Sequence, residues 1–506
     1  MSDLLQAAIA SNLESLQFAG PELALTISIL VIVTVDLVYS GEKRALMTGL
    51  TLAGLLWAVW SIVGLYGTEP RSLFAGMMAL DDFGLFFKLL MAGTTLVVVV
   101  FGIQSTDIDE KLAEFYAVLL TIVLGGFLMA SSTNLLMMYL TLELVSLPSF
   151  ILAGYQRHVQ RSNEAALKYV VYGGVSSGVM LYGFSLIYGL TGTLDLFEVS
   201  SRIAAQGGLD LTLFLAATMS MAGFGYKVAC VPFHFWCPDV YEGAPTPVTA
   251  FLSVAPKAVG FAMLARFFYV GLSSYDGTLG TSLAGQWPEL LAIVSACTMT
   301  LGNLTAIWQN NLKRLLAYSS IAHAGYMMMG VVMLSSAGLQ GVMFYAAVYL
   351  FMNLGAFFVV LLVADRTGSE DIKDFAGLGW RSPFIAAVMT FFLASLTGLP
   401  PTAGFAGKLY LFSAVVEGGL WWLAVVGVLN SAVSLYYYWR IARTMYLEDP
   451  AVAEPLGIPA IATVTLAVLF AGTVVFGIYF GPLSDLTAQS TTLYAPVQAA
   501  AQAMLR

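Results

Sequence analysis

Long apolar runs restrict the folds open to this chain more than any other feature of its sequence. They recur from Pro21 to Pro482 at lengths near or above the roughly 20 residues that cross a hydrocarbon layer of about 30 Å. Only 10% of the 506 residues are charged, whereas a soluble globular protein carries about 25%. Helices satisfy their own backbone hydrogen bonds inside lipid. We therefore predict an all-α, polytopic membrane protein.

The runs predict about fourteen membrane-spanning helices with mostly short connections. The two longest polar connections cover 191–208 and 364–382, and neither could hold a soluble domain. The predicted spans begin near Glu22, Ala45, Asp82, Ala113, Thr133, Ala166, Leu211, Pro247, Pro288, Asn311, Gly341, Pro383, Leu420 and Leu456.

Basic residues are distributed unevenly between the two sets of connections. The positive-inside rule places the richer set in the cytoplasm and both termini on the outer side, which agrees with an even number of spans. No basic segment with a small-residue cleavage site precedes the first apolar run, so the N-terminus is expected to be retained. The richer set carries Lys43, Arg44, Lys111, Arg157, Arg161, Lys313, Arg314, Arg366, Lys373, Arg381, Arg440 and Arg443, and the other carries Arg71, Arg202 and Arg506.

The sequence argues against several kinds of partner and cofactor. The net charge of −9 is spread over the connections, which disfavours a nucleic acid or an anionic lipid as partner. The cysteines form no C-x-x-C pair and the histidines fall on different segments, so no zinc, iron–sulfur or bis-histidine haem site is expected. If the chain serves a redox reaction, we expect other proteins to carry the electrons. These residues are Cys230, Cys237 and Cys297, and His158, His234 and His323.

Ionisable residues deep inside apolar runs are the main functional signal. A charge at the bilayer centre costs at least about 2.5–3.5 kcal/mol on insertion scales, so each needs a partner, a watery cavity or a function. Lys88 could reach the membrane surface or pair with acidic residues near its helix start, and Arg266 does not release a proton at useful pH, so neither is a leading candidate for proton chemistry, although the role of Lys88 stays open. The six residues are Lys88, Glu143, Lys227, Lys257, Arg266 and Lys408.

Glu143, Lys227, Lys257 and Lys408 form the predicted proton-handling set, with a purely structural ion pair as the alternative. Burial disfavours a charged ammonium, whereas a nearby carboxylate favours it. A buried lysine whose carboxylate partner can move is therefore a proton switch.

Prolines accompany three of these lysines. Pro232 follows Lys227, Pro256 precedes Lys257, and "LTGLPPTAG" (396–404) interrupts the span that is expected to end with Lys408. Because proline removes an amide donor, these helices are predicted to be kinked or broken, above all the seventh and the twelfth. Broken helices at membrane depth are typical of inverted-repeat transporters.

A weak internal similarity indicates two related halves. The segment 132–155 follows one predicted span closely, and 309–330 does the same later in the chain. Spans four to eight and nine to thirteen would then be two five-helix repeats, inverted because five is an odd number. The predicted segments are 1–110 with spans one to three, 111–275 and 276–447 with the two repeats, and 448–506 with span fourteen and the tail.

Other candidates remain open on the residues alone. His323 lies mid-helix and could be a structural histidine or a proton relay, and His234 has the same two interpretations. Lys313 and Lys168 lie near the starts of their spans, where simple positive-inside charge also explains them.

Three motifs and one carboxylate carry a resemblance to a known family. The motifs are "KVACVPFHFWCPDVYEGAPTPVTAFLSVAPKA" (227–258), "NNLKRLLAYSSIAHAGY" (310–326) and "LTGLPPTAGFAGKLYLF" (396–412). With Glu143, they resemble the antiporter-like membrane subunits of respiratory complex I, over essentially the whole chain. The resemblance is nearest to subunit N of bacterial proton-pumping NADH:quinone oxidoreductase. Lysine at 408 and the short segment after the last span fit this type better than types M and L.

The resemblance implies roles for individual residues. A fifth-span glutamate pairs with a seventh-span lysine in this family, an eighth-span basic residue passes the proton on, and a twelfth-span residue completes the route. Lysine and histidine on the tenth span join the relay. In this sequence the implied residues are Glu143, Lys227, Lys257, Lys313, His323 and Lys408.

The implied function is proton translocation within a bacterial inner-membrane complex. NADH, FMN, iron–sulfur clusters and quinone would be bound by partner subunits, and this chain would bind no cofactor. Its partners would be other membrane subunits of complex I and membrane lipids. Two alternatives remain: an Mrp-like cation/proton antiporter subunit, and a non-pumping structural or assembly subunit whose buried charges only specify helix packing.

Overall fold

The computed structural model describes residues 2–108, 111–205, 211–273, 287–450 and 455–494. Within this part of the chain, twelve helices are long and apolar enough to cross a membrane. They are α2 (Gly20–Val38), α3 (Arg44–Leu65), α4 (Asp82–Gln104), α5 (Leu112–Ser131), α6 (Leu135–Ala153), α7 (Gln160–Thr191), α9 (Leu211–Val228), α11 (Thr246–Arg266) with the π-helical turn η1 (Phe267–Gly271), α12 (Trp287–Ala306), α13 (Leu312–Val332), α14 (Ser336–Thr367) and α19 (Ala460–Ile478).

The other two predicted spans correspond to less apolar or shorter elements. The twelfth is divided between α16 (Pro383–Thr397) and α17 (Ala403–Glu417), and the thirteenth is α18 (Trp421–Leu447), which carries polar residues in its middle and two arginines toward its end. The predicted all-α membrane fold is confirmed, while the number fourteen stays a prediction.

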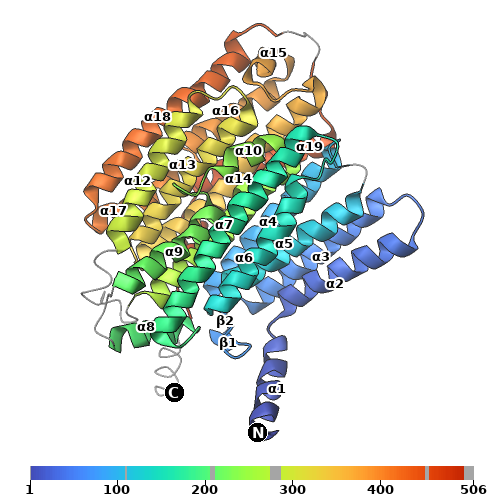
Figure 1. Ribbon diagram of the computed structural model, residues 1–506. Coiled ribbons are helices and arrows are strands. Elements are labelled where there is room, and N and C mark those ends of the chain that lie inside the picture. Colours follow the sequence, from blue (N-terminus) through green and yellow to red (C-terminus); the bar gives the residue numbers. More distant parts are fainter. Residues whose placement is uncertain (1, 109–110, 206–210, 274–286, 451–454, 495–506) are drawn as a thin grey trace.

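Short elements connect or precede the long helices. Strands β1 and β2 form an antiparallel hairpin, with Leu73 opposite Met78. The hairpin, α1 and α8 lie at one end of the molecule (Figure 1), where the Phe74 amide donates to Ser15 Oγ at 3.0 Å. These elements are α1 (Ser2–Leu16), β1 (Arg71–Leu73), β2 (Met78–Leu80), α8 (Leu196–Ala205), α10 (Trp236–Gly243), η2 (Ile372–Phe375), α15 (Leu378–Arg381) and α20 (Gly481–Gln489).

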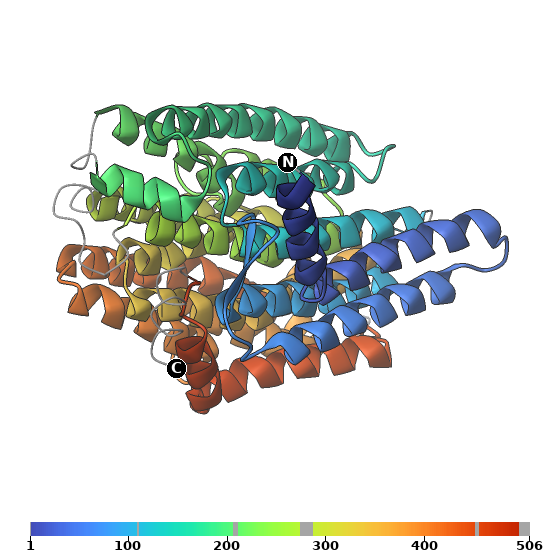
Figure 2. The same ribbon diagram turned by 90° about the horizontal axis from the view of Figure 1, so that it is seen from below.

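Three helices form the centre of the bundle. Every residue of α11 is buried, as are nearly all of α13 and most of α14. Helix α14 contacts α4, α11, α13, α16, α17 and α19, so helices from both predicted halves pack around it. Figure 2 shows α2 and α3 projecting from one side, where their outer faces remain exposed. Buried ionisable groups on α11 and α13 are therefore surrounded by other helices.

The predicted interruptions of spans seven and twelve are present, whereas span eight is not broken at its proline. Residues 229–235 separate α9 from α10, and residues 398–402 separate α16 from α17. In contrast, α11 continues as an α-helix through Pro256. Lys408 does not end its span, because α17 runs on to Glu417. Helix α6 likewise continues through Pro148, so a proline inside a span does not always break it.

The same local arrangement occurs at two places. Asn134 caps the first turn of α6 and forms a bridge with Asp195, which follows α7. Asn311 caps α13 and forms the matching bridge with Asp371, which follows α14. Helices α7 and α14 are each 32 residues long and each ends at a left-handed glycine.

The described helices do not test the predicted segment boundaries. Residues 110 and 275–276, where two boundaries were placed, lie outside the described residues, as does Arg506. The division into 1–110, 111–275, 276–447 and 448–506 therefore stays a prediction.

Candidate functional site

Lys227 is buried in the last turn of α9, beside helix α6. Its Nζ donates to Ser146 Oγ at 2.8 Å, and within the described residues it has no carboxylate within 4.0 Å. Glu143 lies one turn before Ser146 and is half-buried rather than buried as expected. The predicted pair of Glu143 and Lys227 is thus open here, with a serine hydroxyl in contact with the lysine.

Helix α11 places the next lysine close to the first. A methyl group added at Gly260 would lie 3.0 Å from Lys227 Cγ, so the Lys227 side chain runs against α11 one turn from Lys257. Lys257 Nζ donates to Ser320 Oγ on α13 at 2.7 Å and lies 3.9 Å from Cys237 Sγ on α10. Lys257, on the eighth span, therefore contacts both the second half of the broken seventh span and the tenth span.

His323 lies one turn after Ser320 on α13 and is buried. Its Nδ1 is 2.6 Å from the Tyr345 hydroxyl on α14, and its Nε2 is 3.3 Å from the Tyr438 hydroxyl on α18. Both ring nitrogens therefore have a hydroxyl partner, and which nitrogen carries the proton depends on these partners. This geometry suits a group that receives a proton on one side and releases it on the other.

Lys408 lies in the second half of the broken twelfth span, facing the end of the first half. Its Nζ donates to the carbonyl oxygens of Leu396 and Thr397 at 3.2 and 2.8 Å. A third bond runs to Ser431 Oγ on α18 at 3.0 Å, and Ser431 donates to the Tyr326 hydroxyl at 3.1 Å. The carbonyl groups are available because the last turn of a helix leaves them without intrahelical partners.

Lys313 lies in the first turn of α13, before Ser320 and His323 in the middle of the helix. It forms an ion pair with Glu370 at 2.7 Å and donates to the carbonyl oxygen of Ala244 at 2.8 Å. Ala244 directly follows α10, so this lysine connects the broken seventh span to the loop after α14.

Charged residues near Lys313 form a cluster at the same end of the bundle. Arg314 contacts Asp239 at 2.5 Å and Glu242 at 2.9 Å, and Lys168 contacts Asp239 at 2.6 Å. Lys168 therefore already forms an ion pair with Asp239. His234, in the α9–α10 interruption, is buried, and among the described residues its Nδ1 has no hydrogen-bond partner.

Lys88 and Arg266, which were not leading candidates for proton chemistry, have carboxylate partners. Lys88 on α4 pairs with Glu22 on α2 at 2.6 Å, not with the acidic residues near its own helix start. Arg266 pairs with Asp81 through both carboxylate oxygens, at 2.9 and 2.6 Å, and both side chains are completely buried. These pairs join helices from different parts of the chain.

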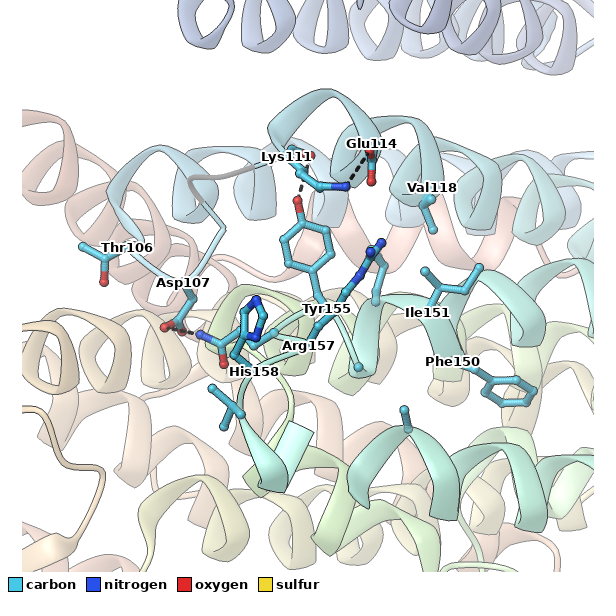
Figure 3. A pocket seen from close by; sticks show the side chains of 15 residues that line it. Thr106, Asp107, Lys111, Glu114, Val118, Phe150, Ile151, Tyr155, Arg157 and His158 are labelled. Carbon is cyan, nitrogen blue, oxygen red and sulfur yellow. Dashed lines mark hydrogen bonds and ion pairs between the residues drawn. The ribbon is translucent and has the colours of Figure 1, made fainter. Parts of the chain in front are cut away.

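A cavity of about 550 Å³ opens between the ends of α4 to α7 (Figure 3). Its polar side chains already bind one another: Gln156 donates to Asp107 at 2.9 Å, and Lys111 pairs with Glu114 at 3.2 Å. None of the predicted site residues lines this cavity. The candidate site is therefore the buried line of side chains and not an open pocket.

Sequence reasoning did not identify the hydroxyl partners. Ser146 is one turn from Glu143 and Ser320 one turn from His323, so helical spacing from a charged residue is the signal that could have found them. Ser431, Tyr345 and Tyr438 come from distant segments and only the tertiary structure brings them to the site. Within the described residues, no group of three or more His, Cys, Asp or Glu side chains could hold a metal ion.

Comparison with known proteins places this chain in a family. A family model described as "NADH:quinone oxidoreductase/Mrp antiporter, TM" matches residues 132–434. NADH-quinone oxidoreductase subunit N of Anaeromyxobacter sp. (strain Fw109-5) is 48% identical over 513 residues, with 96% of this chain and 98% of the relative covered. NADH-quinone oxidoreductase subunit N 2 of Chloroherpeton thalassium is 47% identical over 486 residues, with 94% of each covered.

Solved structures share the same fold. A chain of respiratory complex I from Thermus thermophilus is 32% identical with a TM-score of 0.78, covering 92% of this chain and 99% of that chain. A chain of the Mrp complex from Dietzia sp. DQ12-45-1b has a TM-score of 0.83 at 20% identity, with 97% and 100% covered, which is a likeness of fold alone. The family model matches more than half of the chain, and the two relatives are 47% and 48% identical to it over nearly their whole length. This chain therefore belongs to the NADH:quinone oxidoreductase/Mrp antiporter family of membrane subunits.

Proposed function

We propose that this chain is a proton-translocating membrane subunit of a bacterial NADH:quinone oxidoreductase. The observation that carries the proposal is the set of buried basic side chains, Lys227, Lys257, His323 and Lys408, each hydrogen-bonded to a hydroxyl group inside the bundle. Buried ionisable groups without a counter-ion are costly in a membrane, and they mark ion pathways in transport proteins. The curated relatives named above support the same assignment.

The first step in the proposed mechanism is the opening of the Glu143–Lys227 pair. With the carboxylate close, Lys227 keeps its proton as an ammonium group; with the carboxylate withdrawn, burial favours the neutral amine. The proton then leaves Lys227 Nζ and protonates the neutral amine of Lys257, so one ammonium is lost and one is formed. The contact between the Lys227 stem and Gly260 supports this order because it brings the first lysine beside the helix of the second.

The second step takes the proton across the other half of the chain. Lys257 and His323 are connected through Ser320 and one turn of α13. Beyond the histidine, the Tyr326 and Ser431 hydroxyls lead to Lys408. Lys313 would exchange protons with the cytoplasmic side.

The same proposal includes the topology and the partners. Fourteen spans with both termini outside would place Lys313 and its neighbouring charges at the cytoplasmic face. The matching Asn134–Asp195 and Asn311–Asp371 bridges support two inverted repeats. NADH, FMN, iron–sulfur clusters and quinone would be bound by partner subunits, and other membrane subunits would cover the exposed apolar helices.

The test is redox-linked proton uptake in vesicles that carry the complete complex with Lys227→Ala. Native electrophoresis measures assembly, and Lys373→Ala provides a control because that lysine is exposed, at 77% for its side chain. We expect assembled complex with sharply lower pumping and quinone-reductase turnover in the first variant only. Wild-type pumping in assembled Lys227→Ala complex would refute the proton path.

Two other outcomes separate the alternative functions. A loss of pumping in proportion to a loss of assembled complex would show that Lys227 specifies packing. Exchange of Na⁺ or K⁺ for protons by the purified chain alone would show an Mrp-like antiporter.

A further inference from the structure

The buried lysines of the interior line differ from the other buried cations in what they bind. Lys88 and Lys313 each contact a carboxylate within 2.7 Å. The interior lysines donate to serine hydroxyls instead. Among the described residues, the contacts are Lys227 to Ser146 at 2.8 Å, Lys257 to Ser320 at 2.7 Å and Lys408 to Ser431 at 3.0 Å.

Ser146 differs from Ser431 in where its own proton points. The Ser146 hydroxyl donates to the Leu142 carbonyl oxygen at 2.7 Å, so only its lone pairs face the lysine. The Ser431 hydroxyl donates onward to Tyr326 at 3.1 Å. Ser431 therefore accepts from Lys408 and donates to Tyr326, whereas Ser146 accepts a hydrogen bond from Lys227 and has no free proton to donate to another side chain.

The position of Ser146 relates it to Glu143. The two residues are one helical turn apart on α6, so their side chains project from neighbouring positions on the helix. Ser146 is buried and Glu143 is half-buried. Lys227, with its long flexible stem, can therefore exchange one acceptor for the other with a change of side-chain rotamer.

We propose that Ser146 is a positioning residue that holds the Lys227 ammonium group when the pair with Glu143 is open. This inference rests on the proposed proton-pumping function and adds a second acceptor to its first step. Without the Ser146 hydroxyl, the open ammonium would lose its acceptor on α6, and the carboxylate would hold the lysine for longer. The serine thus stabilises the open arrangement of the Glu143–Lys227 pair relative to the closed one.

The experiment compares Ser146→Ala with Ser149→Ala in the complete complex. Ser149 is a matched control because it is also buried on α6 and donates to a backbone carbonyl one turn earlier, at 2.6 Å from Val145, but binds no lysine. We expect about a tenfold lower pumping rate in Ser146→Ala, the size that corresponds to losing a hydrogen bond to a charged group. Ser149→Ala should pump at the wild-type rate, and Ser146→Thr, which keeps the hydroxyl, should recover most of the rate.

A double-mutant cycle with Lys227→Ala, measured as the thermal half-life of the assembled complex, distinguishes a role through Lys227 from packing. If the Ser146 hydroxyl acts through Lys227, then Ser146→Ala changes the half-life much less once the lysine is gone, whereas a packing defect shortens it by the same factor in both backgrounds. Equal factors in both backgrounds, or equal rates for the two serine variants, overturn the inference. The proposed function survives either result provided that Lys227→Ala still abolishes pumping in assembled complex, and fails if that variant pumps normally.

Discussion

Replacing Arg266 with methionine should destabilise the bundle but leave proton pumping unchanged, because Arg266 lies outside the proposed proton path. Arg266 binds both oxygens of Asp81, and its Nε donates to the Ala130 carbonyl oxygen at 2.7 Å. Asp81 also accepts from the amides of Gly84, where it caps α4, and Tyr494. One ion pair therefore joins the end of α5, the start of α4, the last turn of α11 and the C-terminal segment.

The magnitude follows from the burial of both partners. Both side chains have 0% exposure, so Arg266→Met leaves a carboxylate without its counter-ion inside the protein. Removing one partner of such a pair costs about 3–5 kcal/mol, which is roughly a 10²- to 10⁴-fold change in an unfolding equilibrium. Replacing both charges by well-packed neutral groups is often close to neutral. The double variant Arg266→Met with Asp81→Ser, which keeps a capping oxygen, should therefore recover most of the stability.

The assay is the thermal half-life of the purified complex, followed by native electrophoresis for the wild type, both single variants and the double variant. Arg266→Met and Asp81→Ser should each shorten the half-life strongly, and the double variant should lie near the wild type. Pumping per assembled complex should not change. Wild-type stability of Arg266→Met would refute the assignment of a structural role to the buried pair.

Two further predictions concern other contacts. Gly398→Ala should lower proton pumping more than Gly419→Ala. Both glycines have a positive φ, at +90° and +81°, so the backbone strain is similar. A methyl group at Gly398 would lie 2.8 Å from Lys408 Cδ, whereas one at Gly419 would meet nothing within 4 Å. Pumping rates in vesicles, normalised to assembled complex, measure the difference, and equal rates would contradict it. Glu22→Gln should lower the amount of assembled complex on native gels, because it leaves Lys88 buried without its counter-ion, at a cost of about 3–5 kcal/mol; unchanged abundance would show that this pair is dispensable.

Much of the fold was predictable because hydrophobic length is a local property of the sequence. Each predicted span start falls within or near a described helix, and the proline-containing segments at 229–235 and 398–402 interrupt their helices as expected. Pro256 and Pro148 show the limit of this reasoning, since α11 and α6 continue as helices through them. The short elements α1, α8 and the β-hairpin carry no span-length signal and were not predicted.

The ionisable residues were predictable for a different reason: a charge stands out in an apolar run. Their partners were not, because partner choice depends on which helices become neighbours. Glu22 and Lys88 are far apart in the sequence, and Arg266 meets Asp81 across 185 positions. Glu143 was expected to be buried with Lys227, but α6 directs it toward a partly exposed face while Ser146 meets the lysine.

The carbonyl groups that bind Lys408 have an electrical consequence. Peptide dipoles stabilise an ammonium group but carry no net charge, so a protonated Lys408 adds one positive charge to the interior of its span. The buried pairs of Lys88 and Arg266 add none, because each cation has its carboxylate. Moving one elementary charge across a membrane potential changes the energy by about 2.3 kcal/mol per 100 mV, and a site part-way across takes a share of it. Proton occupancy at Lys408 should therefore respond to the voltage across the membrane, so that the voltage built up by pumping acts back on this site.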